Sequence, residues 1–175
     1  MAEIIDNETG EIKIAPYVPD EDEFDGADFM EASGLASIGR DLILSMPEFS
    51  NFQEAKIRYY WKRAGGKSQG QDKMGACQKP SGLLSFVMHC DFVIWLAADH
   101  VRSWAMQDRL EPLLYHELSH MGFDIDEGTG DVTYRVVGHE FEGFTGEIER
   151  WGFWKDGLRR VELTVDQYNQ GRLAL

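Results

Sequence analysis

Apolar and polar positions form short blocks through the first third of the chain. Two runs of β-forming residues within 4–14 flank residues 7–10 and predict a small hairpin. Residues 15–28 combine two prolines, a glycine and an acidic run, a composition typical of a flexible linker. From residue 28 to residue 46 the apolar positions recur at helical spacing, and Pro47 predicts the end of that helix.

The middle of the chain has the pattern of short strands. β-Branched and aromatic residues crowd segments 56–61 and 91–96, and the second of these is the strongest strand signal in the sequence. Residues 73–79 form a further strand candidate, and three glycines in 64–70 predict a loop before it. The apolar run 81–89 does not distinguish a helix from a strand.

A major helix is predicted over about residues 108–121, where leucines recur at a spacing that forms one apolar stripe. Pro112 has no amide hydrogen to donate, so it must lie in the first turn of that helix. Gly122 is a candidate C-terminal stop. The other predicted elements are a short helical piece in 99–107, a loop at 123–131, a strand at 132–137, a helix at 138–151 and a β-like piece near 161–165.

The charge of the chain is unevenly distributed. It has 31 acidic and 17 basic residues, and eleven of the acidic ones lie in residues 1–31 with Lys13 as the single basic residue there. The net charge disfavours bulk binding to nucleic acid. Residues 52–80 have a positive net charge, with seven basic and two acidic residues. This stretch is either a solvated face or a patch for an acidic partner, and its scattered charges favour the solvated face.

Nothing in the sequence indicates export or membrane insertion. The chain has no apolar run of the roughly 18 residues that a spanning helix needs, and its N-terminus lacks the basic and apolar regions of a secretory signal. We therefore expect a cytoplasmic protein with no membrane partner. In that compartment the two cysteines, Cys77 and Cys90, are expected to be reduced thiols.

The chemistry of the sequence is concentrated in the segment His116-Glu117-Leu118-Ser119-His120, which has the pattern HExxH. On a helix, residues four apart lie on one face, so both imidazoles can reach the same metal ion. Glu117 can then accept a proton from a water on that ion. With five histidines in the chain, chance predicts roughly 0.01 such matches. The motif therefore predicts a catalytic zinc site.

A catalytic zinc ion usually has three protein ligands and one open position. His139 is the best third candidate, because it follows a predicted strand and opens the next predicted helix, 19 residues beyond His120. The carboxylates of Glu140, Glu142 and Glu147 are alternatives. His89 and His100 are weaker candidates, since one precedes a strand and the other lies in a turn.

Three segments together resemble the phage metallopeptidase family: 114–120 (LYHELSH), 138–144 (GHEFEGF) and 149–152 (ERWG). The resemblance covers about residues 50–155 and extends, more distantly, to the minimal zincin core of SprT-like proteases. The sequence departs from the family pattern at Pro112 and at Tyr115, where a helix former and an acidic residue are expected.

The resemblance implies an α+β, zincin-like fold, in which a small mixed or antiparallel sheet packs on the HExxH helix and a following C-terminal helix. It implies a Zn²⁺ ion on His116, His120 and His139, with Glu117 as the catalytic base. The expected domain is 29–175, after an acidic arm at 1–28. The expected activity is peptide-bond hydrolysis, in the host cytoplasm if the protein is phage-encoded, with segment 91–96 as the edge strand that binds the substrate.

Several further points stay open in the sequence. A non-catalytic, zinc-containing binding or regulatory protein, possibly associated with nucleic acid, is the alternative to a peptidase. Tyr134 and Arg135 are candidates for oxyanion stabilisation, although ordinary strand side chains are the simpler interpretation. Asp124, Asp126 and Glu142 are candidates for orienting a ligand imidazole. The oligomeric state is not encoded in any pattern that we recognise.

Overall fold

The computed structural model describes residues 3–5, 12–14, 17–68, 70–103, 109–139, 145–154, 158–159, 162 and 166. The chain divides into two compact units, residues 1–137 and residues 138–175. The fold is α+β, as predicted, with a mixed four-stranded sheet, three two-stranded hairpins and several short helices among the described residues. The predicted boundary at residue 28 stays a prediction.

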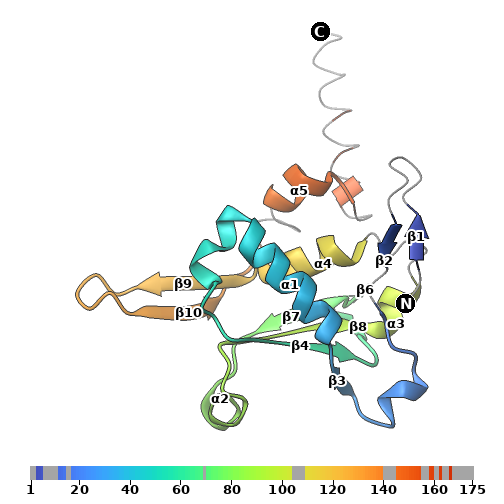
Figure 1. The fold of residues 1–175 in the computed structure, drawn as a ribbon, viewed down its shortest axis with the longest axis horizontal. Coiled ribbons are helices and arrows are strands. Elements are labelled where there is room, and N and C mark those ends of the chain that lie inside the picture. Colours follow the sequence, from blue (N-terminus) through green and yellow to red (C-terminus); the bar gives the residue numbers. More distant parts are fainter. Residues whose placement is uncertain are drawn as a thin grey trace. The chain divides into compact units, whose positions relative to one another are not determined.

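The four-stranded sheet is the centre of the first unit, and its strand order is β3-β4-β8-β7 (Figure 1). Strands β4 (Ile57–Lys62) and β8 (Phe92–Ala97) are parallel, whereas β3 (Phe29–Glu31) and β7 (Gly75–Gln78) pair antiparallel with them. The predicted strands at 56–61, 73–79 and 91–96 are thus confirmed. The predicted edge strand is wrong, because β8 lies between β4 and β7, and β7 is the edge.

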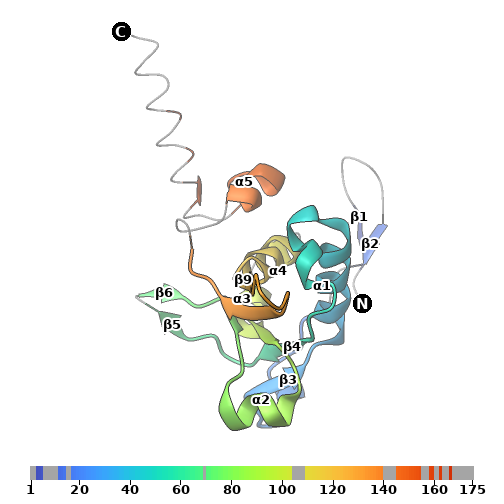
Figure 2. The same cartoon turned by 90° about the vertical axis from the view of Figure 1, so that its left-hand side faces the viewer.

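Two helices, α1 (Ser33–Ser45) and α4 (Leu110–Leu118), lie over one face of this sheet (Figures 1 and 2). A Cβ atom added at Gly39 of α1 would lie 2.5 Å from the Tyr59 hydroxyl on β4, so the helix approaches the sheet closely at this point. The fully buried residues of β8 and α4 fill the layer between sheet and helices: Phe92, Ile94, Leu96, Leu110, Leu114 and Leu118.

The first predicted helix is shorter than its apolar pattern suggested. It begins at Ser33 rather than residue 28, because Phe29–Glu31 pair with β4 and complete the sheet on that side. Pro47 ends it as predicted and begins a 3-10 helix, Pro47–Phe52. Upstream, residues predicted to be a linker contain a 3-10 turn, Asp22–Phe24, and both Pro19 and Phe24 are buried.

Three hairpins surround the sheet. Strands β1 (Glu3–Ile5) and β2 (Ile12–Ile14) pair as predicted. Strand β5 (Lys67–Ser68) lies inside the predicted glycine loop and pairs with β6 (Gln71–Asp72), which follows that loop. Strand β9 (Met121–Ile125) pairs with β10 (Val132–Val136), which confirms the strand prediction at 132–137 but corrects the loop predicted at 123–131. A Cβ at Gly122 would lie 2.6 Å from Val137 Cγ1, so this glycine permits the pairing.

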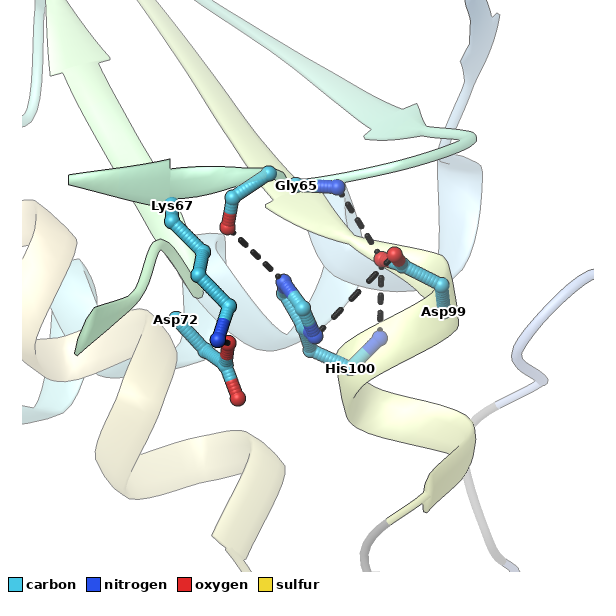
Figure 3. A network of polar contacts seen from close by, with 6 residues as sticks. Gly65, Lys67, Asp72, Asp99 and His100 are labelled. Atoms are coloured by element: carbon cyan, nitrogen blue, oxygen red, sulfur yellow. Dashed lines mark hydrogen bonds and ion pairs between the residues drawn. The ribbon is translucent and has the colours of Figure 1, made fainter. Parts of the chain in front are cut away.

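The remaining helices are short. The ambiguous run at 81–89 forms helix α2 (Gly82–Met88), and α3 (Ala98–Ser103) follows β8. Asp99 of α3 accepts hydrogen bonds from the backbone N–H groups of Gly65 and His100, and His100 Nε2 lies 3.1 Å from the Gly66 carbonyl (Figure 3). These contacts fix the loop that follows β4. None of the described helices is long and apolar enough to cross a membrane.

The second unit contains helix α5 (Thr145–Trp151), which corresponds to the C-terminal half of the helix predicted at 138–151. Gly138 and His139 have no helical structure, and residues 140–144 lie outside the described part of the chain. The indole of Trp154 donates a hydrogen bond to the fully buried carboxylate of Glu147. Within the β-like piece predicted near 161–165, the described residue Glu162 is helical, which corrects that prediction at this position.

Candidate metal centre

Helix α4 carries the first half of the HExxH motif into the interior. It begins at Leu110, so Pro112 lies in its first turn, where a missing N–H group leaves no hydrogen bond unmade, as predicted. His116 is 7% exposed and Glu117 is 4% exposed. Two polar side chains so deeply buried need specific partners, and neither is without one.

The Tyr115 side chain makes two specific contacts within the first unit. Its ring packs edge-on against Phe49, with ring centres 5.2 Å apart, and its hydroxyl donates a hydrogen bond of 2.8 Å to Glu48. The tyrosine therefore ties α4 to the 3-10 helix that follows α1. From the resemblance an acidic residue was expected at position 115, and these contacts give the tyrosine a structural role there.

Helix α4 ends at Leu118, two residues before His120 and earlier than the predicted end at residue 121. Residues 119 and 120 form a turn after α4, but the His120 N–H still donates to the Glu117 carbonyl at 3.2 Å. The two imidazole rings remain neighbours, with centroids 5.3 Å apart and ring planes at 83°. The geometry expected from i,i+4 spacing is thus retained after the regular helix stops.

Val137 orients His120 through its backbone. The Val137 carbonyl lies 2.7 Å from His120 Nδ1, and the Val137 N–H donates to the His120 carbonyl at 2.8 Å. A carbonyl can only accept, so Nδ1 carries the proton and the lone pair of Nε2 is left for a ligand. A backbone carbonyl in this role has no sequence signature, and sequence reasoning missed it.

Two of the three acidic residues suggested for that role have other partners. Asp124 pairs with Arg135 at 3.0 Å, and both side chains are well exposed on the β9–β10 hairpin. Asp126 accepts the backbone N–H groups of Thr129 and Gly128 in the hairpin turn, and these bonds lower its pKa. Glu142 lies outside the described residues.

The third histidine joins the first two. The ligand atoms of His116, His120 and His139 all lie within 4.8 Å of one another. His116 is buried, His120 is half-buried and His139 is exposed. His139 lies two residues beyond Val137, whose backbone is bonded to His120.

The alternative ligands do not join this cluster in the described part of the chain. Glu147 accepts the Trp154 hydrogen bond, and Glu140 is outside the described residues. His89 ends α2, and His100 contacts Gly66 near β5.

Both cysteines, Cys77 and Cys90, are free and buried, as expected. Burial raises the pKa of the Cys77 thiol, and the nearby Glu117 carboxylate raises this pKa further, so the Cys77 side chain is a neutral thiol.

Strand β7 lies directly against the carboxylate of the motif. A Cβ atom at Gly75 would lie 2.7 Å from Glu117 Oε1, 2.8 Å from Leu96 Cδ2 and 2.9 Å from the Trp95 carbonyl oxygen. Real Cβ atoms do not occur this close, so the position of Glu117 depends on a glycine at residue 75. Sequence reasoning missed this contact, because the two residues are 42 positions apart in the chain.

The two residues suggested for oxyanion stabilisation both have contacts of a structural kind, and the suggestion stays a prediction. The Tyr134 ring packs near Phe52 and Phe92, with ring centres 6.0 and 5.4 Å apart. Arg135 is engaged by Asp124 on the exposed side of β10. These contacts are of the kind that is usual for strand side chains.

Comparison with known proteins identifies the family to which this arrangement belongs. Residues 27–168 match the model of the family described as "Putative phage metallopeptidase". The chain belongs to this phage metallopeptidase family. No curated protein and no solved structure gave a significant match. The family match spans both the HExxH segment and His139, so the metallopeptidase family and the three-histidine cluster, which could bind a metal ion, coincide in one region.

Proposed function

We propose that this member of the phage metallopeptidase family is a zinc-dependent enzyme that hydrolyses peptide bonds, with His116, His120 and His139 as metal ligands and Glu117 as the general base. The observation that carries the proposal is the convergence of three imidazoles within 4.8 Å beside a buried glutamate. Membership of the family supports a protein or peptide substrate.

The donor set fits zinc. Three neutral imidazoles with an open fourth position are a known arrangement for catalytic zinc. Nitrogen ligands at about 2.0–2.1 Å from a tetrahedral ion lie roughly 3.4 Å from one another, a separation that falls within the 4.8 Å limit on the spacing of the three histidines. The bond of His120 Nδ1 to the Val137 carbonyl fixes the tautomer that a metal requires.

The chain's own residues supply the proton transfers. When bound, zinc would polarise the substrate carbonyl and lower the pKa of a water at its open position to about 7. Glu117 adjoins the first ligand, and burial shields its carboxylate from competing solvent. We infer that it accepts a proton from the attacking water and passes it to the leaving amine. Gly75 provides the space in which that carboxylate lies.

Strand β7 is the proposed docking edge for the substrate backbone. The Ala97 N–H donates to the Met74 carbonyl at 2.8 Å, so residues 74, 76 and 78 direct their backbone polar groups toward β8. The N–H and C=O groups of Gly75 and Cys77 then point to the other side, where no strand pairs with β7 within the described residues. An extended peptide can add there as a further strand, next to Glu117.

The proposal is tested by metal analysis together with one substitution. Purified protein is expected to hold about one zinc per chain and to cleave unfolded protein substrates such as casein. Glu117→Gln should retain the zinc, because it removes no ligand, and should lose hydrolysis, because the amide cannot accept the proton. A zinc-loaded Glu117→Gln variant that cleaves as fast as the wild type would exclude Glu117 as the base.

A further inference from the structure

The face of the sheet that points away from α4 carries two lysines beside the proposed docking edge. Successive side chains of a strand point to opposite faces, so Ala76 points away from the face on which Gly75 meets the motif. Ala76 pairs with Trp95 of β8. Nζ of Lys62 lies 4.6 Å from the centre of the Trp95 ring, and Nζ of Lys73 lies 5.2 Å from it.

These two ammonium groups have no carboxylate partner among the described residues. Other cations of the same basic stretch are paired. Arg63 contacts Asp28 at 3.1 Å, and Lys67 contacts Asp72 at 3.9 Å (Figure 3). Lys62 and Lys73 are each half-buried, and both ammonium groups lie within cation–π distance of the Trp95 ring.

A bound peptide would bring one side chain to these lysines. If the peptide pairs antiparallel with β7, its residue opposite Ala76 forms a non-hydrogen-bonded pair, in which the Cα atoms are about 4.5 Å apart. The side chain of that residue lies on the same face as the Ala76 methyl group. The alanine side chain is a single methyl group, so a longer substrate side chain can extend across it toward the ammonium groups of Lys62 and Lys73.

We propose that Lys73 and Lys62 form a subsite that selects Asp or Glu at the substrate position opposite Ala76, adjacent to the residue opposite Gly75. This inference rests on the proposed peptidase function and names its substrate class. A single-stranded nucleic acid is a poorer fit to the same charges, because Trp95 is covered and cannot offer its ring to a base.

Cleavage-site profiling tests the subsite directly. Zinc-loaded wild-type protein is incubated with a mixed library of short peptides, and the cut sites are read by mass spectrometry. We expect acidic residues to be enriched roughly twofold to tenfold at one position next to the cut, the range given by one or two partly exposed ion pairs. Lys73→Glu should reverse this preference toward Lys and Arg, and Lys73→Met should abolish it.

Lys67→Glu is the matched control, because it makes the same charge change at a lysine that faces Asp72. It should leave the profile unchanged. Equal profiles for wild type and Lys73→Glu, with cleavage still dependent on Glu117, would overturn the subsite while leaving the peptidase proposal intact. Loss of the preference in both the Lys73→Glu and Lys67→Glu variants would also overturn it, since the effect would then be one of overall charge.

Binding separates the subsite from catalysis. Zinc-loaded Glu117→Gln protein is titrated into a fluorescein-labelled nonapeptide with Glu at its centre, and into the same peptide with Gln, using fluorescence anisotropy. Tighter binding of the Glu peptide, lost in a Glu117→Gln/Lys73→Glu double variant and weakened by salt, supports the subsite even if no peptide is cleaved. Equal binding of the two peptides overturns it, as does tighter binding of a labelled oligothymidylate that depends on Lys73.

Discussion

Replacement of Gly75 by alanine tests the contact between the edge strand and the motif glutamate. The added methyl group would meet Glu117 Oε1 at 2.7 Å, Leu96 Cδ2 at 2.8 Å and the backbone oxygen of Trp95 at 2.9 Å. An ordinary carbon contact is about 3.5–4.0 Å, so relief requires shifts on the order of 0.5–1 Å. The Trp95 oxygen belongs to the adjacent strand β8, and so the displacement falls largely on the Glu117 side chain.

Two effects of different size follow. Overpacking of this kind costs about 1–3 kcal/mol in the free energy of unfolding, which lowers the melting temperature by roughly 2–12 °C for a chain of this length. Displacement of a general base by up to about 1 Å reduces kcat on the order of 100-fold, with little change in KM. Zinc content should be unchanged, because none of the atoms nearest the added methyl group belongs to a histidine.

The assay combines thermal unfolding, zinc analysis and casein hydrolysis for Gly75→Ala. Gly34→Ala is the control, because a Cβ at that helical position meets nothing within 4 Å and should slightly stabilise the protein. The reasoning is refuted if Gly75→Ala matches wild type in both stability and kcat.

Three further outcomes are expected. His139→Ala should weaken zinc affinity by at least about tenfold in a competitive chelator titration, since it removes one of three imidazoles; unaltered affinity would assign the third ligand elsewhere. Tyr115→Phe should lower the free energy of unfolding by about 1 kcal/mol in urea, because the bond to Glu48 is lost, and a Glu48→Gln/Tyr115→Phe pair should show non-additivity. Stability should fall as pH rises above about 9, the ordinary thiol pKa, because burial raises the pKa of Cys77 in the folded state and the unfolded chain loses that proton first. Cys77→Ala should flatten that part of the pH profile, and an unchanged slope would contradict this assignment.

Features that depend on residues close together in the chain could be predicted from the sequence. The HExxH spacing predicted two adjacent imidazoles, and Pro112 placed the start of α4 to within two residues. The apolar density of 91–96 predicted a strand. Such apolar density is typical of interior strands, which are buried on both faces, whereas the edge position was expected only from the resemblance to zincins.

Other features depend on pairings between distant segments, which a single sequence does not record. Phe29–Glu31 has helical apolar spacing, yet it pairs with β4, so tertiary pairing overrides the local pattern. The orientation of His120 depends on the carbonyl of Val137, an atom that every residue has. The need for glycine at residue 75 follows from the packing of β7 against Glu117, a contact between segments that are distant in the sequence.

The central claim is that three histidines hold one zinc ion with an open position facing Glu117. X-ray diffraction from zinc-loaded crystals, recorded on both sides of the zinc absorption edge, tests it most directly. The account predicts a single anomalous peak about 2.0–2.1 Å from nitrogens of His116, His120 and His139, with solvent as the remaining ligand. A peak that excludes His139, or one whose fourth ligand is another protein side chain, would contradict it.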